Sequence, residues 1–140
     1  MMEIADVRKR ILSTIERARQ RAAERRTRAD EAARAYSTFL EGTATPLFRQ
    51  VANVLRAEGH HFSVSTPSGS VRLMSDRTAE DYIELLLDTT GDAPHVTGHT
   101  SRSRGRRVIE TERAIGDPAR LDENAVLDFL TKELEAFVDR

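Results

Sequence analysis

Among the first forty residues, apolar side chains recur every three or four positions, which is the spacing of one face of an α-helix. The stretch Glu3–Leu40 contains neither proline nor glycine, and one row of positions runs along it in steps of three and four. Nine of the eleven positions in this row are apolar or alanine, which is typical of a helix seam that packs on another helix. The row consists of Ile4, Arg8, Ile11, Ile15, Ala18, Ala22, Arg25, Ala29, Ala32, Tyr36 and Phe39.

The length of this helix predicts that it extends beyond its own domain. At about 1.5 Å per residue it would be about 57 Å long, whereas a compact domain of 140 residues has a diameter of about 40 Å. We therefore divide the chain into a coiled-coil-like helix, residues 1–41, and a globular domain, residues 42–140. Two alternatives are an amphipathic helix that packs only on its own domain, and a helix that stays free or docks on a foreign protein.

A second helix is predicted after a short break. Glu41-Gly42-Thr43 predicts the end of the first helix, with Gly42 as a left-handed cap. Thr45 and Pro46 suit the N-cap and the first position of the second helix, which we expect to end at Gly59. Its apolar stripe, expected to be buried, is Leu47, Phe48, Val51, Ala52, Val54 and Leu55.

From His61 onward the apolar period changes to two, which is typical of strands. Residues 61–66 and 71–73 predict a hairpin around Pro67-Ser68-Gly69, with proline at the second and glycine at the fourth turn position. The next run, residues 82–88, suits a helix or a strand. We favour a strand, with Ile83, Leu85 and Leu87 facing inward, because turn residues follow at 89–92. Two more strands are predicted, at residues 94–101 and 107–115.

A final helix completes the predicted α+β fold. Asp122 is its expected N-cap, and its apolar stripe is Val126, Leu127, Leu130, Leu134, Phe137 and Val138. The predicted order is a long N-terminal helix, a second helix, an antiparallel meander of about five strands, and a C-terminal helix packed on one sheet face. The other sheet face is then expected to contact water or a partner.

Charge and composition narrow the functional classes. The net charge is −1, so the whole chain does not indicate nucleic-acid binding. The charge is uneven, however: residues 8–28 carry a net charge of +7, and residues 117–140 carry −4. Cysteine is absent, which excludes disulfides and thiolate catalysis and is compatible with a reducing compartment. The sequence shows no signal-peptide or membrane-span pattern, so we expect a cytoplasmic protein that does not contact membranes.

Four histidines are the candidate metal ligands. His60 and His61 open the first predicted strand, and His95 and His99 lie four apart on the fourth. Residues four apart on a strand are separated by about 13 Å, too far to share a metal that needs three or four converging ligands. We therefore predict no metal site and no cofactor.

The open sheet face is a candidate ligand site. Period-two alternation places Arg72, Tyr82, Glu84 and His99 on this face, with Ser63, Ser65 and Thr97 beside them. Such side chains can bind a small polar ligand or supply acid–base chemistry. The same side chains are also typical of any solvated antiparallel face.

Arginines near a predicted hairpin tip are candidate phosphate contacts. These are Arg102, Arg104, Arg106 and Arg107. Together with the basic first helix they suggest nucleic-acid binding, since guanidinium groups pair with phosphate in a fork. The few aromatic residues and the absence of a groove-reading motif count against it.

The leading hypothesis is a non-enzymatic, homo-oligomeric interaction module, a scaffold, adaptor or chaperone-like protein, that dimerises through the N-terminal helix. Arg8 and Arg25 would have to reach water or meet acids of the partner. Nucleic-acid binding, and ligand binding or catalysis on the open sheet face, are the alternatives. The predicted interface residues are Ile4, Ile11, Ile15, Ala18, Ala22, Ala29, Ala32 and Tyr36.

Overall fold

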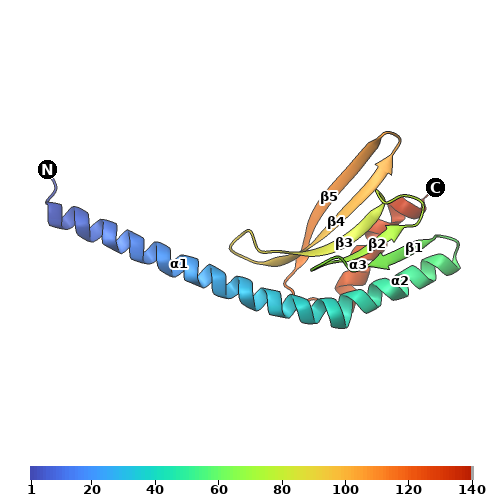
Figure 1. The fold of residues 1–140 in the computed structure, drawn as a ribbon, viewed down its shortest axis with the longest axis horizontal. Coiled ribbons are helices and arrows are strands. Elements are labelled where there is room, and N and C mark those ends of the chain that lie inside the picture. Colours follow the sequence, from blue (N-terminus) through green and yellow to red (C-terminus); the bar gives the residue numbers. More distant parts are fainter. Residues whose placement is uncertain (140) are drawn as a thin grey trace.

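The predicted α+β architecture is confirmed by a computed structural model that describes residues 1–139. Two helices come first, then five strands, then a last helix (Figure 1). The elements are α1 (Ile4–Phe39), η1 (Leu40–Ala44), α2 (Thr45–Ala57), β1 (Phe62–Ser65), β2 (Val71–Ser75), β3 (Tyr82–Asp88), β4 (His95–Arg104), β5 (Arg107–Gly116) and α3 (Glu123–Val138).

The five strands form one antiparallel meander in the order β1-β2-β3-β4-β5. The helices α2 and α3 lie on one side of this sheet, and α1 extends away from the body (Figure 1). Leu73, Ile83 and Leu85 are fully buried between the sheet and the helices, with Phe48 of α2 and Leu130 of α3. The inward positions predicted from the period-two pattern are therefore confirmed.

The predicted break between the first two helices is wrong. Gly42 lies inside η1, a turn of π-helix, and does not adopt the left-handed conformation of a cap. Thr45 is not an N-cap either, because Ala44 before it is helical and no side chain caps α2. Pro46 has no N–H to donate to the preceding turn, and the N–H of Thr45 instead reaches back to the carbonyl of Leu40. The chain is thus helical from residue 4 to residue 57.

The π-helical turn keeps two apolar faces aligned on one core. It adds an extra residue to one turn of the helix, which shifts the helical phase of everything after it. Tyr36 and Phe39 before the turn, and Leu47 and Phe48 after it, are all buried in the same core. A regular α-helix with the same sequence would rotate one of these pairs away from the sheet.

The tyrosine and one arginine of α1 fix where this helix meets the body. The hydroxyl of Tyr36 donates to the carbonyl oxygens of Gly69 at 2.8 Å and Leu85 at 3.2 Å. About two turns before Tyr36, Nε of Arg28 donates to the carbonyl of Asp92 at 3.1 Å. The second half of α1 therefore crosses the end of the sheet, while the first half leaves it.

Two turn predictions have different outcomes. Gly59 ends α2 as expected, with a positive φ of 88°. The first hairpin turn is shifted by one residue, because the N–H of Ser70 donates to the carbonyl of Pro67 at 2.9 Å. Proline is then at the first turn position and Gly69 at the third, where a φ of 75° fits a type II turn.

The last helix begins where expected, but each stripe contains one exposed residue. Asp122 caps α3 by accepting from the N–H of Ala125 at 2.9 Å. Val54 of α2 is 64% exposed, so the prediction that the α2 stripe is buried is wrong at this position. In the apolar stripe of α3, Leu127 is 38% exposed. Both residues lie at the edges of their stripes, which wrap further around each helix than the sheet can cover.

Candidate functional site

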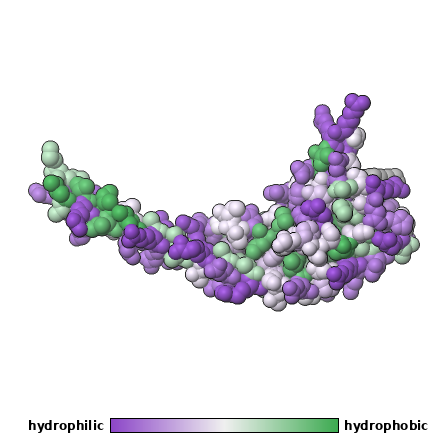
Figure 2. All heavy atoms as spheres, viewed as in Figure 1, coloured by the Kyte–Doolittle hydropathy of each residue, from purple (hydrophilic) through white to green (hydrophobic). Residues whose placement is uncertain are grey.

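The first part of α1 carries an uncovered apolar stripe. We call residues 4–27 the α1 arm; from residue 4 to residue 21 every side chain is exposed. Ile4 is 86% exposed, Ile11 55% and Ile15 39%, and Val7 and Leu12 are exposed beside them. Figure 2 shows apolar side chains gathered over the N-terminal end of α1, away from the body.

The same row of positions is covered in its second half by the chain itself. Ala29 and Ala32 are half-buried, and Tyr36 is only 5% exposed. Ala32 lines a cavity with Pro94 and Asp117, from the loops at the end of the sheet. Tyr36 therefore belongs to the core of the subunit, and we leave it out of any contact with a second copy. The stripe is thus one continuous surface. The body of the subunit covers its C-terminal half and leaves its N-terminal half exposed.

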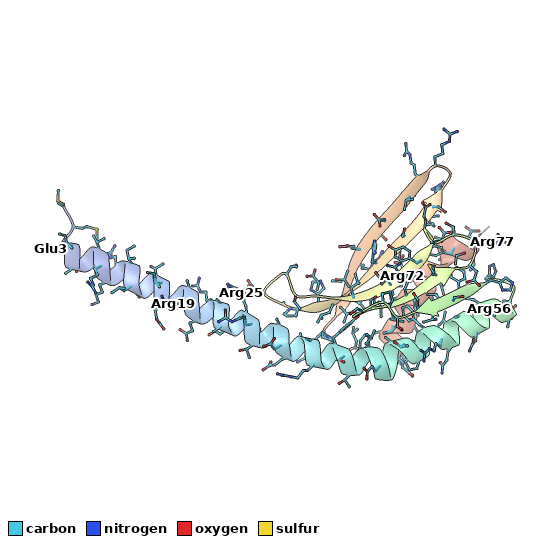
Figure 3. The ribbon with its side chains drawn as sticks, viewed as in Figure 1. Glu3, Arg19, Arg25, Arg56, Arg72 and Arg77 are labelled. Carbon is cyan, nitrogen blue, oxygen red and sulfur yellow. The ribbon has the colours of Figure 1, made fainter. Side chains whose placement is uncertain are left out.

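Arginines border the uncovered stripe. Figure 3 shows Arg19 and Arg25 on the extended part of α1. At 3.6 residues per turn, Arg10 and Arg21 lie along one edge of the stripe. Arg8 belongs to the row itself, and Arg19 follows it on the side of Leu12. Any surface that covers the α1 arm must therefore combine an apolar centre with a rim that accepts positive charge.

The structure brings the four predicted residues of the open sheet face together. Strand register places Arg72, Glu84 and His99 in one cross-strand row. Nε of Arg72 lies 2.9 Å from the carboxylate of Glu84, and its guanidinium group stacks 4.0 Å over the ring of Tyr82. The rings of Tyr82 and His99 meet edge to face at 5.5 Å, and Nε2 of His99 lies 3.4 Å from Glu110.

These side chains satisfy one another. Glu84 is only 5% exposed and accepts both from Arg72 and from the hydroxyl of Ser70 at 3.2 Å. Burial, and after it the negative charge of Glu84, raises the pKa of Tyr36 to about 12. Thr97, expected on the solvated face, is instead buried, and its hydroxyl lacks a hydrogen-bond partner among residues 1–139. A ligand that binds on this face would have to break these contacts.

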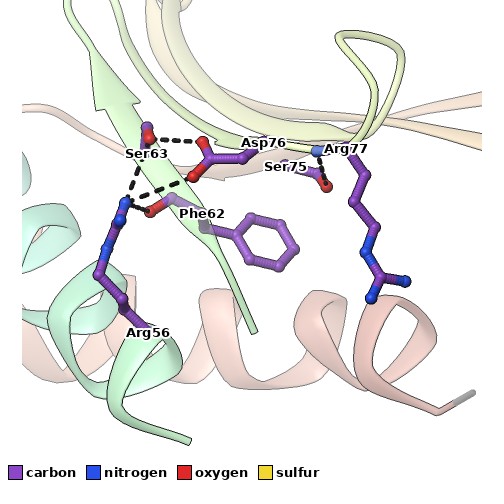
Figure 4. Close-up of polar contacts among 6 residues, drawn as sticks. All are labelled: Arg56, Phe62, Ser63, Ser75, Asp76 and Arg77. Atoms are coloured by element: carbon purple, nitrogen blue, oxygen red, sulfur yellow. Dashed lines mark hydrogen bonds and ion pairs between the residues drawn. The ribbon is translucent and has the colours of Figure 1, made fainter. Parts of the chain in front are cut away.

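At the C-terminal end of α2, Arg56 joins the helix to the first strands (Figure 4). Its guanidinium group donates to the carbonyl of Phe62 at 3.0 Å and lies 3.5 Å from the carboxylate of Asp76. Asp76 in turn accepts from the hydroxyl of Ser63 at 2.5 Å. These contacts lie within the subunit and join the C-terminal end of α2 to β1 and to the turn after β2.

A small cavity of about 190 Å³ lies near this contact. His60, His61 and Arg77 contribute positive or neutral donors to its wall, and Phe137 contributes an apolar surface. Asp81 also lines it and is almost wholly buried, with Ser103 donating to its carboxylate from both N–H at 2.7 Å and hydroxyl at 2.9 Å. The mixed charge of the wall favours no single class of ligand.

Among residues 1–139, none of the helices has the length and hydrophobicity of a membrane span.

The four histidines do not come together in one site. His95 lies 3.7 Å from Asp88 and His99 pairs with Glu110. Within residues 1–139, no group of three histidine, aspartate or glutamate side chains is placed to hold a metal ion. The arginines of the β4–β5 hairpin lie at a tip that extends from the body (Figure 1), with Arg104, Arg106 and Arg107 exposed and Arg102 half-buried.

A groove that sequence reasoning missed lies between α2 and α3. It has a volume of about 320 Å³, and its wall is almost wholly apolar. The two exposed stripe residues, Val54 and Leu127, lie on its opposite sides. The available signal was the width of the two apolar stripes, each too broad for one sheet contact. The other apolar residues of the groove are Leu47, Val51, Leu55 and Leu134.

Comparison of the chain with protein-family models, curated proteins and solved structures found no match.

Proposed function

We propose that the protein is a non-enzymatic interaction module, a scaffold, adaptor or chaperone-like protein, that forms a homodimer through the α1 arm. The observation that carries the proposal is the uncovered half of the α1 stripe. Ile4, Ile11 and Ile15 are exposed in the single chain, while the same row is buried by the body from Tyr36 onward. A second copy of the chain is the simplest molecule that could cover the exposed half.

The energetics support association. Full burial of a large aliphatic side chain contributes about 1.5–3 kcal/mol. The α1 arm exposes five such side chains, so two arms together offer about ten, less what partial burial has already contributed. Association costs about 4–15 kcal/mol in lost translational and rotational freedom, so covering both arms can exceed this cost. The five side chains are those of Ile4, Val7, Ile11, Leu12 and Ile15.

The proposal is tested by the mass of the full chain in solution. Light scattering at tens of micromolar should give twice the chain mass of 15.7 kDa. The variant Ile11→Asp with Ile15→Asp should be monomeric, because it places charge in the covered stripe. Val108→Asp is the matched control, since Val108 is also an exposed apolar residue, 46% exposed, but lies on β5; it should remain dimeric. A full chain that stays monomeric would contradict the proposal.

Nucleic-acid association is the second candidate, favoured by the exposed arginines of the β4–β5 tip. Three arginines are exposed at a tip that extends from the body, and the α1 arm is strongly basic. Fluorescence anisotropy with a generic duplex tests it. Binding that falls steeply with salt and is lost in Arg104→Glu with Arg106→Glu would support this function, and no binding at low salt would remove it.

A further inference from the structure

The groove between α2 and α3 and the α1 arm are complementary surfaces. We propose that the groove of one subunit binds the α1 arm of a second copy, in a reciprocal exchange of arms. This inference rests on the dimer proposed above, and it names the surface that covers the arm. The occupant is the stripe of Ile4, Ile11 and Ile15, and its site is the apolar wall that includes Val54 and Leu127.

A subunit cannot fill its own groove with its own arm. The chain is helical from residue 4 to residue 57 through α1, η1 and α2, so the α1 arm points away from the groove that α2 borders (Figure 1). To fold the arm back onto the groove, the helix would have to break between the arm and Tyr36 and Phe39, which are buried in the core. An arm from a second copy meets no such restriction.

The charges of the two surfaces are opposite. On α3, the exposed residues Asp128 and Glu135 lie one helical turn before and after Thr131, which lines the groove. Exposed Glu123 lies one turn before Leu127. These acids form a negative rim on the α3 side of an apolar wall. The α1 arm presents the reverse charge, an apolar stripe that contains Arg8 and has further arginines beside it, so docking would pair the charges as it covers the apolar side chains.

The α1 arm is long enough to reach a second body and place part of its stripe in the groove. The α1 arm of 24 residues is about 36 Å long, and α2, with 13 residues, is about 20 Å long. The isoleucines of the arm span residues 4 to 15, about 17 Å. The α2 residues that line the groove run from Leu47 to Leu55, about 12 Å, so the groove can cover about two helical turns of the stripe.

The first test changes the groove without touching the arm. Val54→Asp with Leu127→Asp places two charges on exposed groove positions, where folding should be retained, and circular dichroism checks this. We expect the dimer dissociation constant to rise at least about tenfold, measured by sedimentation, while the control Val108→Asp leaves it unchanged. A groove variant that dimerises normally, while Ile11→Asp with Ile15→Asp is monomeric, overturns this inference and leaves the proposed dimer standing. A monomeric parent chain overturns both.

The second test uses the absence of cysteine in the chain. A chain with Ile11→Cys, mixed with a chain with Val54→Cys and oxidised, should give a disulfide-linked pair that contains one of each. Link formation only between Ile11→Cys chains would show that arms pair with each other and would overturn the inference. Salt gives an independent reading, because docking of a basic arm on an acidic rim weakens as screening increases. Pairing of two basic arms would instead strengthen with salt.

Discussion

The hydroxyl of Tyr36 lies 2.8 Å from the carbonyl oxygen of Gly69, and this contact ties the long helix to the turn between β1 and β2. The same hydroxyl is within 3.2 Å of the carbonyl of Leu85 on β3. Tyr36 is 5% exposed, so removing its hydroxyl would leave two carbonyl groups without this donor. Tyr36 is therefore one of the side chains that fix the position of α1 on the sheet, with Arg28 and the buried Phe39.

Tyr36→Phe should destabilise the fold. The substitution keeps the ring in place and removes a buried hydrogen-bond donor, which costs about 1–2 kcal/mol. We expect a lower free energy of unfolding by urea denaturation, with far-UV circular dichroism unchanged. An unchanged free energy of unfolding would mean that the hydroxyl does not hold α1 on the sheet.

The stability should also fall at alkaline pH through the same residue. Burial, reinforced by the charge of Glu84, raises the pKa of Tyr36 from 10.0 to about 12 in the folded chain. The folded state therefore binds this proton more tightly than the unfolded state. The contribution is complete below pH 10 and is lost as the pH rises toward 12, in total about 3 kcal/mol. The parent is expected to be more stable than Tyr36→Phe at pH 9. Because the loss exceeds that advantage, the difference in unfolding free energy should reach zero and change sign as the pH approaches 12.

Gly42→Ala should stabilise the protein. Gly42 lies in a helical conformation, and an added Cβ would meet no atom within 4 Å. Replacing a helical glycine by alanine contributes about 0.5–1 kcal/mol. Gly69→Ala is the contrasting variant, because Gly69 has a φ of 75° that alanine adopts only with strain. The midpoint of thermal unfolding should be higher for Gly42→Ala than for the parent chain, and lower for Gly69→Ala. A lower midpoint for Gly42→Ala would indicate that Gly42 adopts the left-handed conformation of a helix cap.

The sequence predicted the elements better than their junctions. Residues 82–88 suited a helix or a strand, and the turn residues at 89–92 decided for the strand that the structure shows as β3. Burial of Glu84 between Ile83 and Leu85 places buried residues on both faces of β3, which a period-two pattern does not predict. Gly42, Thr45 and Pro46 have the local chemistry of a helix end, yet burial of apolar residues on both sides keeps the helix continuous. Period two placed Arg72 and its neighbours on one face, but the pairing among them depends on strand register. The groove between α2 and α3 exists only once two helix edges meet in space.

Gly98→Ala should be strongly destabilising for a reason that sequence could not show. A Cβ at Gly98 would lie 2.3 Å from Cζ of Phe129, which packs over β4 from α3. The ring or the helix must shift, at a cost of about 1–3 kcal/mol. Gly91→Ala is the matched control, because a Cβ there meets nothing within 4 Å. Chemical denaturation should separate the two variants, and equal stability would show that Phe129 can move without cost.

The strength of the contact between Arg72 and Glu84 distinguishes a structural role of the open sheet face from a role in ligand binding. If the cluster stabilises the sheet, Arg72→Met leaves a carboxylate that is 5% exposed without its charged partner and should cost about 3 kcal/mol. The double variant Arg72→Met with Glu84→Met replaces the pair by two apolar side chains and should recover much of that loss. A double-mutant cycle in urea measures the coupling between the two residues. A coupling near zero would mean that neither residue is needed for the fold, and that this row of side chains is free to serve a ligand.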